Sequence, residues 1–242
     1  MQNRKAIIEL RRKRKRQQRL TTILIISGIA LIVATFLMLP TIQSALTPVG
    51  EIIDPDENLR PMMSGNAMGN PDAPVVIEEF SDYGCGHCGN FSKEAGKQIA
   101  EMYVAEGQVY FISRSVGSMM NNTISPKLAE AAYCAGDQGK YWPYRDYIFA
   151  NQIALYSSNL PVRKHIEAFA KSLNLDMDTF AACYDNHKYE ARVQQDEKAS
   201  REAGINSTPS FLINGELMIG TRPFGDFQQI IAAKLAEAAA NE

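Results

Sequence analysis

The order of apolar and polar residues divides the chain into three parts. Leu20 to Leu39 are twenty residues without a charge, and a helix of that length, at about 1.5 Å per residue, spans roughly the 30 Å of a bilayer core. Residues 41–68 contain several Pro and Gly and show no sustained period, which predicts a tether. From residue 69 to residue 242, strand and helix patterns alternate, which predicts one folded domain.

The stretch around residue 85 organises this predicted domain. The β-branched run that extends from Val75 to Phe80 is typical of a buried central strand, and Gly84 ends the pattern. Two cysteines follow, at positions 85 and 88. Beyond them, apolar residues recur at helical spacing, namely Phe91, Ala95, Ile99 and Met102. The pattern predicts a strand that leads into a helix, to about Ala105, whose first turn carries Cys-x-x-Cys.

The remainder of the domain continues the alternation. Residues 108–113 form a second predicted strand, and the strand–helix–strand order favours parallel pairing. A helical insert covers about residues 120–203, and two further strand patterns are joined by Asn214-Gly215, a strong hairpin signal. The predicted insert helices are 126–137, 141–151, 162–173, 177–185 and 188–203, the hairpin strands are 210–213 and 217–219, and the last helix is 224–240. The expected fold class is α/β.

The distribution of charge sets the expected topology. The net charge of −2 conceals an asymmetry, because nine of the 25 Lys and Arg lie within residues 1–19 beside a single acid. Under the positive-inside rule, residues 1–19 are a basic cytoplasmic tail, residues 20–40 a transmembrane anchor, and the rest of the chain is outside. A cleaved signal peptide is the alternative, although the apolar segment exceeds the usual length and no good small-x-small site follows.

The basic run also has the composition of a nucleic-acid or anionic-lipid patch. Its position directly before an apolar span favours a role in topology, so no nucleic-acid partner is expected. Either reading of the apolar span places the domain in an oxidising compartment, where the four cysteines can form two disulfides.

Placing Cys85 and Cys88 at the start of a helix has a chemical consequence. The free amide N–H groups and the positive dipole end of the helix stabilise a thiolate, and a protonated His87 adds to the effect. Cys85 is expected to be the more exposed sulfur, with a pKa lowered into the range of about 3.5–7.5, and Cys88 to be shielded. The pair can close a small disulfide and pass it on by thiol–disulfide exchange.

Metal binding is the alternative use of these cysteines. Cys134 and Cys183 could complete a zinc site and a histidine could complete a copper site, but neither cysteine lies in a second Cys-x-x-Cys. We therefore expect no metal or other cofactor. Cys134 and Cys183 are 49 positions apart, and a structural disulfide between them would remove about 4 kcal/mol of unfolded-state entropy. Free buried thiols or a second redox relay are the other possibilities.

Four motifs in this order carry a resemblance to a known family. They are Gly69 with DAPV at 72–75, EEFSDYGCGHC at 78–88, AAYCAGDQGKYWPYRDYIFANQ at 131–152 and GINSTPSFLING at 204–215. Strand, Cys-x-x-Cys helix, distant Thr-Pro before a hairpin and final helix resemble the thioredoxin fold. The long helical insert resembles the DsbA-like thiol–disulfide oxidoreductases, over roughly residues 69–240. The CGHC sequence itself resembles protein disulfide isomerases more than the CPHC common in DsbA-like proteins.

The resemblance implies roles for three further residues. Glu79 corresponds to a buried acid near the inner cysteine, which would have a raised pKa and relay the proton of Cys88. An exposed Glu79, with Glu78 pointing inward, is the alternative. The Thr208–Pro209 bond would be cis and pack against Cys-x-x-Cys, leaving backbone groups free to pair with a substrate chain.

We expect a membrane-anchored extracytoplasmic oxidoreductase that introduces disulfides into exported proteins through Cys85 and Cys88. The expected partners are folding exported proteins and a quinone-linked membrane protein that reoxidises the pair. A reductase or isomerase, for example in cytochrome c assembly, is one alternative. A metal-binding or chaperone-like module without turnover is the other.

Overall fold

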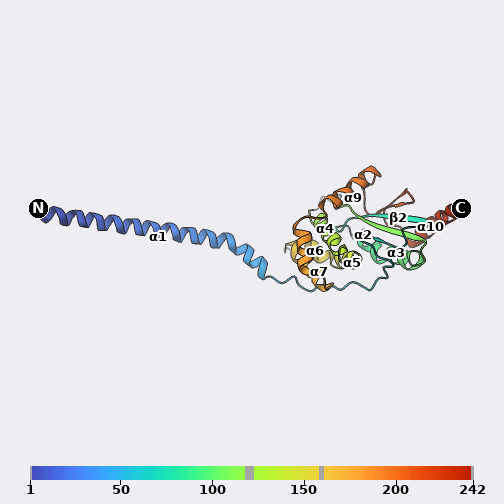
Figure 1. The fold of residues 1–242 in the computed structure, drawn as a ribbon, viewed down its shortest axis with the longest axis horizontal. Helices are drawn as coiled ribbons and strands as arrows, with labels where there is room; N and C mark the ends of the chain where they lie inside the picture. Colours follow the sequence, from blue (N-terminus) through green and yellow to red (C-terminus); the bar gives the residue numbers. More distant parts are fainter. Residues whose placement is uncertain (1, 118–122, 158–160, 241–242) are drawn as a thin grey trace. The chain divides into compact units, whose positions relative to one another are not determined.

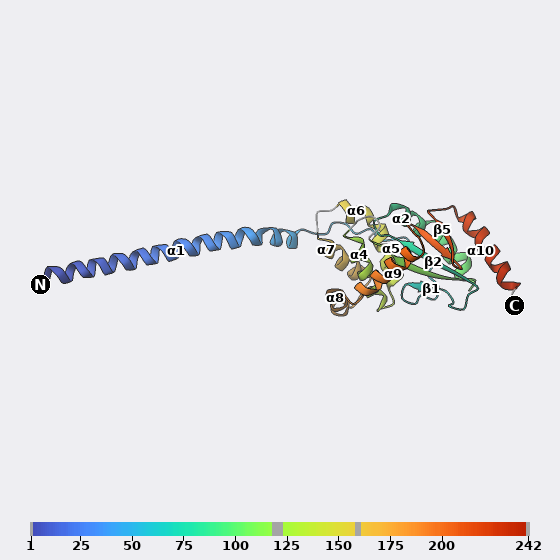
Figure 2. The same cartoon turned by 90° about the horizontal axis from the view of Figure 1, so that it is seen from above.

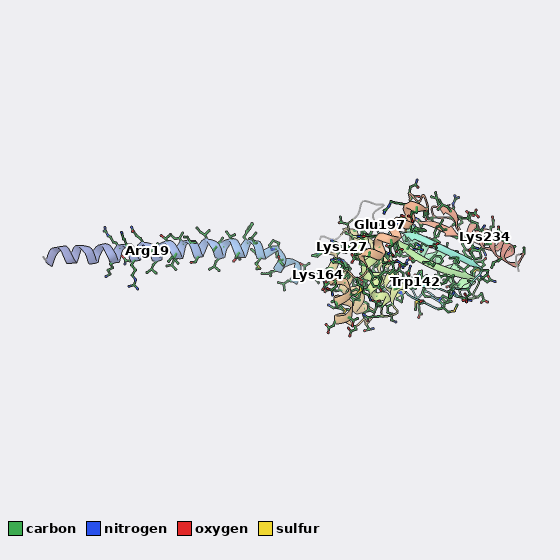
Figure 3. The ribbon with its side chains drawn as sticks, turned by 45° about the horizontal axis from the view of Figure 1, so that its top comes forward. Arg19, Lys127, Trp142, Lys164, Glu197 and Lys234 are labelled. Carbon is green, nitrogen blue, oxygen red and sulfur yellow. A yellow bond between two sulfur atoms is a disulfide. The ribbon has the colours of Figure 1, made fainter. Side chains whose placement is uncertain are left out.

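The computed structural model describes residues 2–117, 123–157 and 161–240. Two compact units make up the chain, residues 1–48 and residues 49–242. The first unit is one helix, α1 (Gln2–Leu46), which contains Pro40 and includes both the predicted basic tail and the predicted anchor. Residues Lys13–Gln43 are long and apolar enough to cross a membrane. The exposed apolar side chains project from this helix in Figure 3, in agreement with a membrane anchor.

The second unit is built on a five-stranded sheet in the order β1-β3-β2-β4-β5 (Figures 1 and 2). β2 and β3 are parallel, as the strand–helix–strand order predicts, and the other pairs are antiparallel. Alternate residues of β2 and β3 are fully buried, which explains why the two segments are rich in β-branched and aromatic residues. The strands are β1 (Ala67–Met68), β2 (Val75–Ser81), β3 (Val109–Ser115), β4 (Ser210–Ile213) and β5 (Glu216–Ile219).

An aromatic cluster joins one face of the sheet to α2 (Gly86–Lys93) and α10 (Phe224–Ala239). Phe91 of α2 lies at the centre of this cluster, with its ring centroid 4.6 Å from that of Phe211 and 5.5 Å from that of Phe227. Because Phe91 is three residues after Cys88, burial of its ring fixes the rotation of α2 and turns Cys88 toward the core. The packing of α2 thus determines which cysteine is shielded.

The opposite face of the sheet is covered by α9 (Glu190–Glu202), which leads directly to the Thr208–Pro209 segment. Asp196 of α9 is fully buried and lies 3.2 Å from Arg114 of β3, and it also accepts a hydrogen bond from Tyr133. A buried carboxylate needs such partners to offset its desolvation. This cluster therefore holds α9, and with it the start of β4, in place against the sheet.

The helical insert is described except for residues 118–122 and 158–160, which lie outside the described residues. Its helices are α4 (Ser125–Gly136), α5 (Tyr141–Ala150), α6 (Gln152–Ser157), α7 (Val162–Ser172), α8 (Met177–Asp185) and α9. Trp142 of α5, labelled in Figure 3, is buried and donates from its indole N–H to the carbonyl of Ala67, 2.9 Å away. This hydrogen bond joins the helical insert to strand β1.

Two local predictions were wrong. The helix expected to continue from residue 86 to about 105 breaks at Glu94, which has φ −110° and ψ −94°, and continues as α3 (Ala95–Ile99) and a π-helical turn, η1 (Ala100–Val104). Gly96 packs against Phe91 at this break, where a Cβ would lie 2.9 Å from the Phe91 carbonyl oxygen. The short helix α6 was not predicted, because six residues are too few to show a helical period.

The predicted tether of residues 41–68 requires the larger correction. Helix α1 includes residues up to Leu46, and the folded unit begins at Val49 rather than at residue 69. Arg60 forms a buried ion pair with Asp146 at 2.6 Å, and residues 67–68 pair with β3. One contact is a single ion pair and the other is backbone pairing of a two-residue strand, and neither requires a repeated apolar pattern in the sequence.

Candidate active site

Cys85 and Cys88 lie at the start of α2, directly after the central strand β2. Cys85 occupies the N-cap position, and its backbone N–H donates to the carbonyl of Asp82, 3.0 Å away. Both cysteines are free thiols, so the structure represents the reduced form. Cys85 is only 6% exposed and Cys88 is completely buried, which keeps the order of exposure that the sequence predicts while leaving Cys85 more shielded than expected.

Hydrogen bonds lower the pKa of Cys85 to about 5. The largest contribution comes from the Cys88 thiol, followed by Thr208 and by the backbone N–H groups of Cys88 and His87, while burial opposes the shift. Burial, together with the neighbouring Cys85, raises the pKa of Cys88 well above its usual range. The two sulfurs therefore differ in protonation at neutral pH, where Cys85 is expected as a thiolate and Cys88 as a thiol.

His87 is exposed on the first turn of α2. Its backbone N–H is among the donors that lower the pKa of Cys85, and its carbonyl accepts a hydrogen bond from the Thr221 hydroxyl at 3.5 Å. The charge effect expected of its imidazole remains a prediction.

Thr208 lies against Cys85, and the peptide bond between Thr208 and Pro209 is cis. The Cys85 Sγ is 3.4 Å from the Thr208 carbonyl oxygen and donates to it as a thiol. Gly220, just after β5, donates its N–H to the Pro209 carbonyl at 2.9 Å, which ties the segment to the end of the hairpin. The structure thus brings residues separated by more than a hundred positions to one sulfur atom.

Glu79 is fully buried on β2, whereas Glu78 is partly exposed and pairs with Arg114. Burial raises the pKa of the Glu79 carboxyl, and the nearby Arg145 guanidinium opposes that shift. One guanidinium nitrogen of Arg145 donates to both carboxylate oxygens of Glu79 at 2.7 Å. The predicted buried acid therefore has a buried counterion from the helical insert.

Arg145 also connects this pair to the cysteine helix. Its other terminal nitrogen donates to the Ser92 hydroxyl at 2.7 Å, and Ser92 follows Cys88 by four residues on the same face of α2. The guanidinium lies 4.7 Å from the ring centroid of Phe149. Sequence reasoning missed Arg145, although a single cation among the aromatic residues of YWPYRDYIF is a signal that such a side chain has a buried partner.

Cys134 and Cys183 form a disulfide that joins α4 to α8, with an S–S distance of 1.99 Å. The bridge lies within the helical insert and does not join the Cys85 site. Because both sulfurs are bonded to each other, they are not available to complete the zinc site considered as an alternative for Cys85 and Cys88.

Comparison with known proteins identifies the domain. A family model described as Thioredoxin matches residues 63–233. The Na⁺/H⁺ antiporter NhaA 3 of Salinispora tropica is 28% identical over 67% of this chain, and that match covers only 22% of the antiporter's length. Disulfide bond formation protein D of Bacillus subtilis is 21% identical over 71% of this chain and 76% of its own.

A solved structure shows the same architecture. The crystal structure of α-DsbA1 of Wolbachia pipientis superimposes with a TM-score of 0.65 at 22% identity, over 76% of this chain and 96% of that one. The thioredoxin-like α/β fold and the DsbA-like resemblance, both expected from the sequence, are thereby confirmed.

Proposed function

The chain belongs to the thioredoxin family, and from that premise we propose that it is a membrane-anchored protein disulfide oxidoreductase that transfers the Cys85–Cys88 disulfide to exported proteins. The observation that carries the proposal is the asymmetry of the two sulfurs, one a hydrogen-bonded thiolate beside a cis-proline and the other a buried thiol. The name of the Bacillus subtilis relative, a disulfide bond formation protein, supports the same activity.

The chemistry follows from this asymmetry. A substrate thiolate attacks the sulfur of Cys85 in the oxidised enzyme, the Cys85–Cys88 bond breaks, and Cys88 leaves with the electron pair and takes up a proton. A second substrate thiolate then attacks the substrate sulfur of the mixed disulfide, and Cys85 leaves as a thiolate. The substrate loses two electrons and gains a disulfide, and the enzyme ends with Cys85 and Cys88 both reduced, as they are in the structure.

The low pKa of Cys85 favours oxidation of substrates over their reduction. Groups that stabilise the Cys85 thiolate act on the reduced enzyme only, so they make its disulfide less stable by comparison and a stronger oxidant. Each tenfold change in this equilibrium corresponds to about 30 mV for a two-electron couple. The structure thus supports the oxidase reading over the reductase or isomerase.

A hollow of about 480 Å³ beside the first turn of α2 is a suitable place for a substrate chain. Its lining combines polar groups with the exposed side chain of Ile153 and consists of Gly86, His87, Asn90, Lys93, Phe149, Ala150, Gln152 and Ile153. The backbone of Thr208, whose carbonyl oxygen lies 3.4 Å from the Cys85 Sγ, is the second expected substrate contact.

The proposed topology places residues 1–19 in the cytoplasm and the catalytic domain outside, because nine cationic residues precede the apolar helix. Reoxidation requires an acceptor of two electrons, and a quinone-linked membrane protein is the proposed partner for a domain held at the membrane.

The test measures both the reactive sulfur and the direction of transfer. Alkylation of the reduced full chain should modify Cys85 first, with a rate that follows thiolate formation and a midpoint near the pKa of about 5. Oxidised protein should convert a dithiol peptide to its disulfide with loss of one enzyme disulfide per peptide. The proposal fails if Cys85→Ser still oxidises the peptide, or if the measured potential lies in the range of about −270 mV typical of reducing thioredoxin.

A further inference from the structure

Gln152, the first residue of α6, reaches from the helical insert to the backbone of the cysteine turn. Its side-chain Nε2 donates to the carbonyl oxygen of Tyr83 at 2.7 Å and to that of Cys85 at 2.9 Å. The two carbonyls belong to the loop that connects β2 to α2, and Gln152 is 67 positions away from the second of them. A single amide group therefore closes the turn that presents Cys85.

The Cys85 carbonyl is the first acceptor of α2. It receives the backbone N–H of Cys88 at 3.1 Å and that of Gly89 at 3.2 Å, so its position determines how the first turn of the helix begins. Gly89 also leaves room for the Gln152 side chain, because a Cβ at position 89 would lie 2.9 Å from the Gln152 Oε1. The side chain thus fits the first turn of α2 closely at two of its residues.

Asn151, the residue before Gln152, is itself anchored by hydrogen bonds. Asn151 is buried and exchanges two hydrogen bonds with the backbone of Ile53, each 2.8 Å long, and it also donates to the carbonyl of Tyr147. The junction between α5 and α6 is therefore held on one side by the segment after α1 and holds the cysteine turn on the other. Because its backbone is anchored in this way, Gln152 can hold the turn of residues 83–85 in a defined position.

We propose that Gln152 is a positioning residue for Cys85, holding the Tyr83–Cys85 turn so that the N–H groups of His87 and Cys88 stay directed at the sulfur. The proposal rests on the proposed function, since it takes Cys85 as the sulfur that attacks and is attacked. A second effect acts in the same direction, because the amide hydrogens neutralise the partial negative charge of two carbonyls next to the thiolate.

The test compares the full chain in detergent with three variants. Gln152→Ala removes both hydrogen bonds to the cysteine turn. Gln152→Glu keeps the shape of the side chain but places a carboxylate, which only accepts hydrogen bonds, against the two carbonyls. Gln138→Ala is the matched control, because Gln138 also bridges backbone groups within the insert, donating to the Asp176 carbonyl and accepting from the Asp176 N–H. Thiolate absorbance at 240 nm against pH gives the pKa of Cys85, and equilibration with glutathione gives the potential.

Gln152→Ala is expected to reduce the thiolate-to-thiol ratio of Cys85 about tenfold at a given pH, which lowers the potential by about 30 mV. Gln152→Glu is expected to shift both quantities further, and Gln138→Ala to leave both unchanged. The proposal is overturned if Gln152→Ala titrates like the wild type, or if Gln138→Ala shifts the Cys85 titration equally.

These outcomes are separable from the fate of the proposed function. A wild-type protein that oxidises no dithiol peptide, combined with a shifted Cys85 titration in Gln152→Ala, removes the oxidase assignment and supports the positioning role. A wild-type oxidase whose Gln152→Ala variant titrates normally removes the positioning role alone.

Discussion

Replacing Arg145 by Met removes the counterion of Glu79 while keeping most of the side-chain volume. The carboxylate of Glu79 is completely buried, and both of its oxygens accept hydrogen bonds from Arg145. Breaking a buried pair by removing one partner typically costs about 3–5 kcal/mol, because an uncompensated charge remains in the interior. We expect a loss of stability in this range at pH 7.

The loss should depend on pH in a defined direction. Burial already raises the pKa of Glu79 and Arg145 opposes the increase, so the variant should have a still higher folded-state pKa. The folded variant then holds a proton that the unfolded chain has released. Its stability relative to the wild type should therefore be greatest in acid and decrease as the pH rises from the unfolded value of about 4.3 through the raised folded value.

Trp142 provides the signal for the measurement, because it is the single tryptophan of the chain and lies 5.4 Å from the Arg145 guanidinium. Urea titrations of the full chain in detergent, followed by its fluorescence, give the change in unfolding free energy. Arg163→Met is the control, since Arg163 is partly exposed and its ion pairs with the partly exposed Glu167 and the exposed Asp185 should contribute below about 1 kcal/mol.

A double variant, Glu79→Leu with Arg145→Met, separates charge from packing. Replacing the whole pair with apolar groups should recover most of the lost stability, since no buried charge remains. The reasoning is refuted if Arg145→Met costs no more than Arg163→Met, or if the double variant is less stable than either single variant.

Three further predictions concern the cysteines and the domain boundary. His87→Ala should raise the pKa of Cys85 by about half a unit and make the protein a weaker oxidant, as thiolate absorbance and glutathione equilibration would show; an unchanged titration would exclude the charge effect. The Cys134–Cys183 bridge should survive mild reduction that opens the active-site pair, because it is buried, and mass spectrometry after graded alkylation would reveal simultaneous labelling if it did not. The free energy of unfolding of a fragment of residues 49–242 should exceed that of a fragment of residues 69–242 by about 3–5 kcal/mol, because the shorter fragment lacks Arg60 and leaves buried Asp146 unpaired. Equal urea midpoints for the two fragments would show that residues 49–68 add no stability.

The sequence alone determined what depends on neighbouring residues. The β-branched run of β2, the glycine that ends it and the period of α2 place Cys85 and Cys88 at a helix start, because periodicity and turn chemistry act over a few positions. The same holds for the hairpin at Asn214 and Gly215 and for the uncharged segment of α1. These local signals, taken in order, predicted an α/β domain, and the motifs within it carried the resemblance to the thioredoxin fold.

Only the tertiary structure decided which distant groups surround the cysteines. Arg145 lies 66 positions after Glu79, and Gln152 lies 67 positions after Cys85, yet each meets its partner through hydrogen bonds shorter than 3 Å. The segment from Val49 to Met68 joined the domain through isolated polar contacts in the same way. Such pairings leave no period in the sequence, because a single donor and a single acceptor suffice, and only the packing of the whole chain specifies which ones meet.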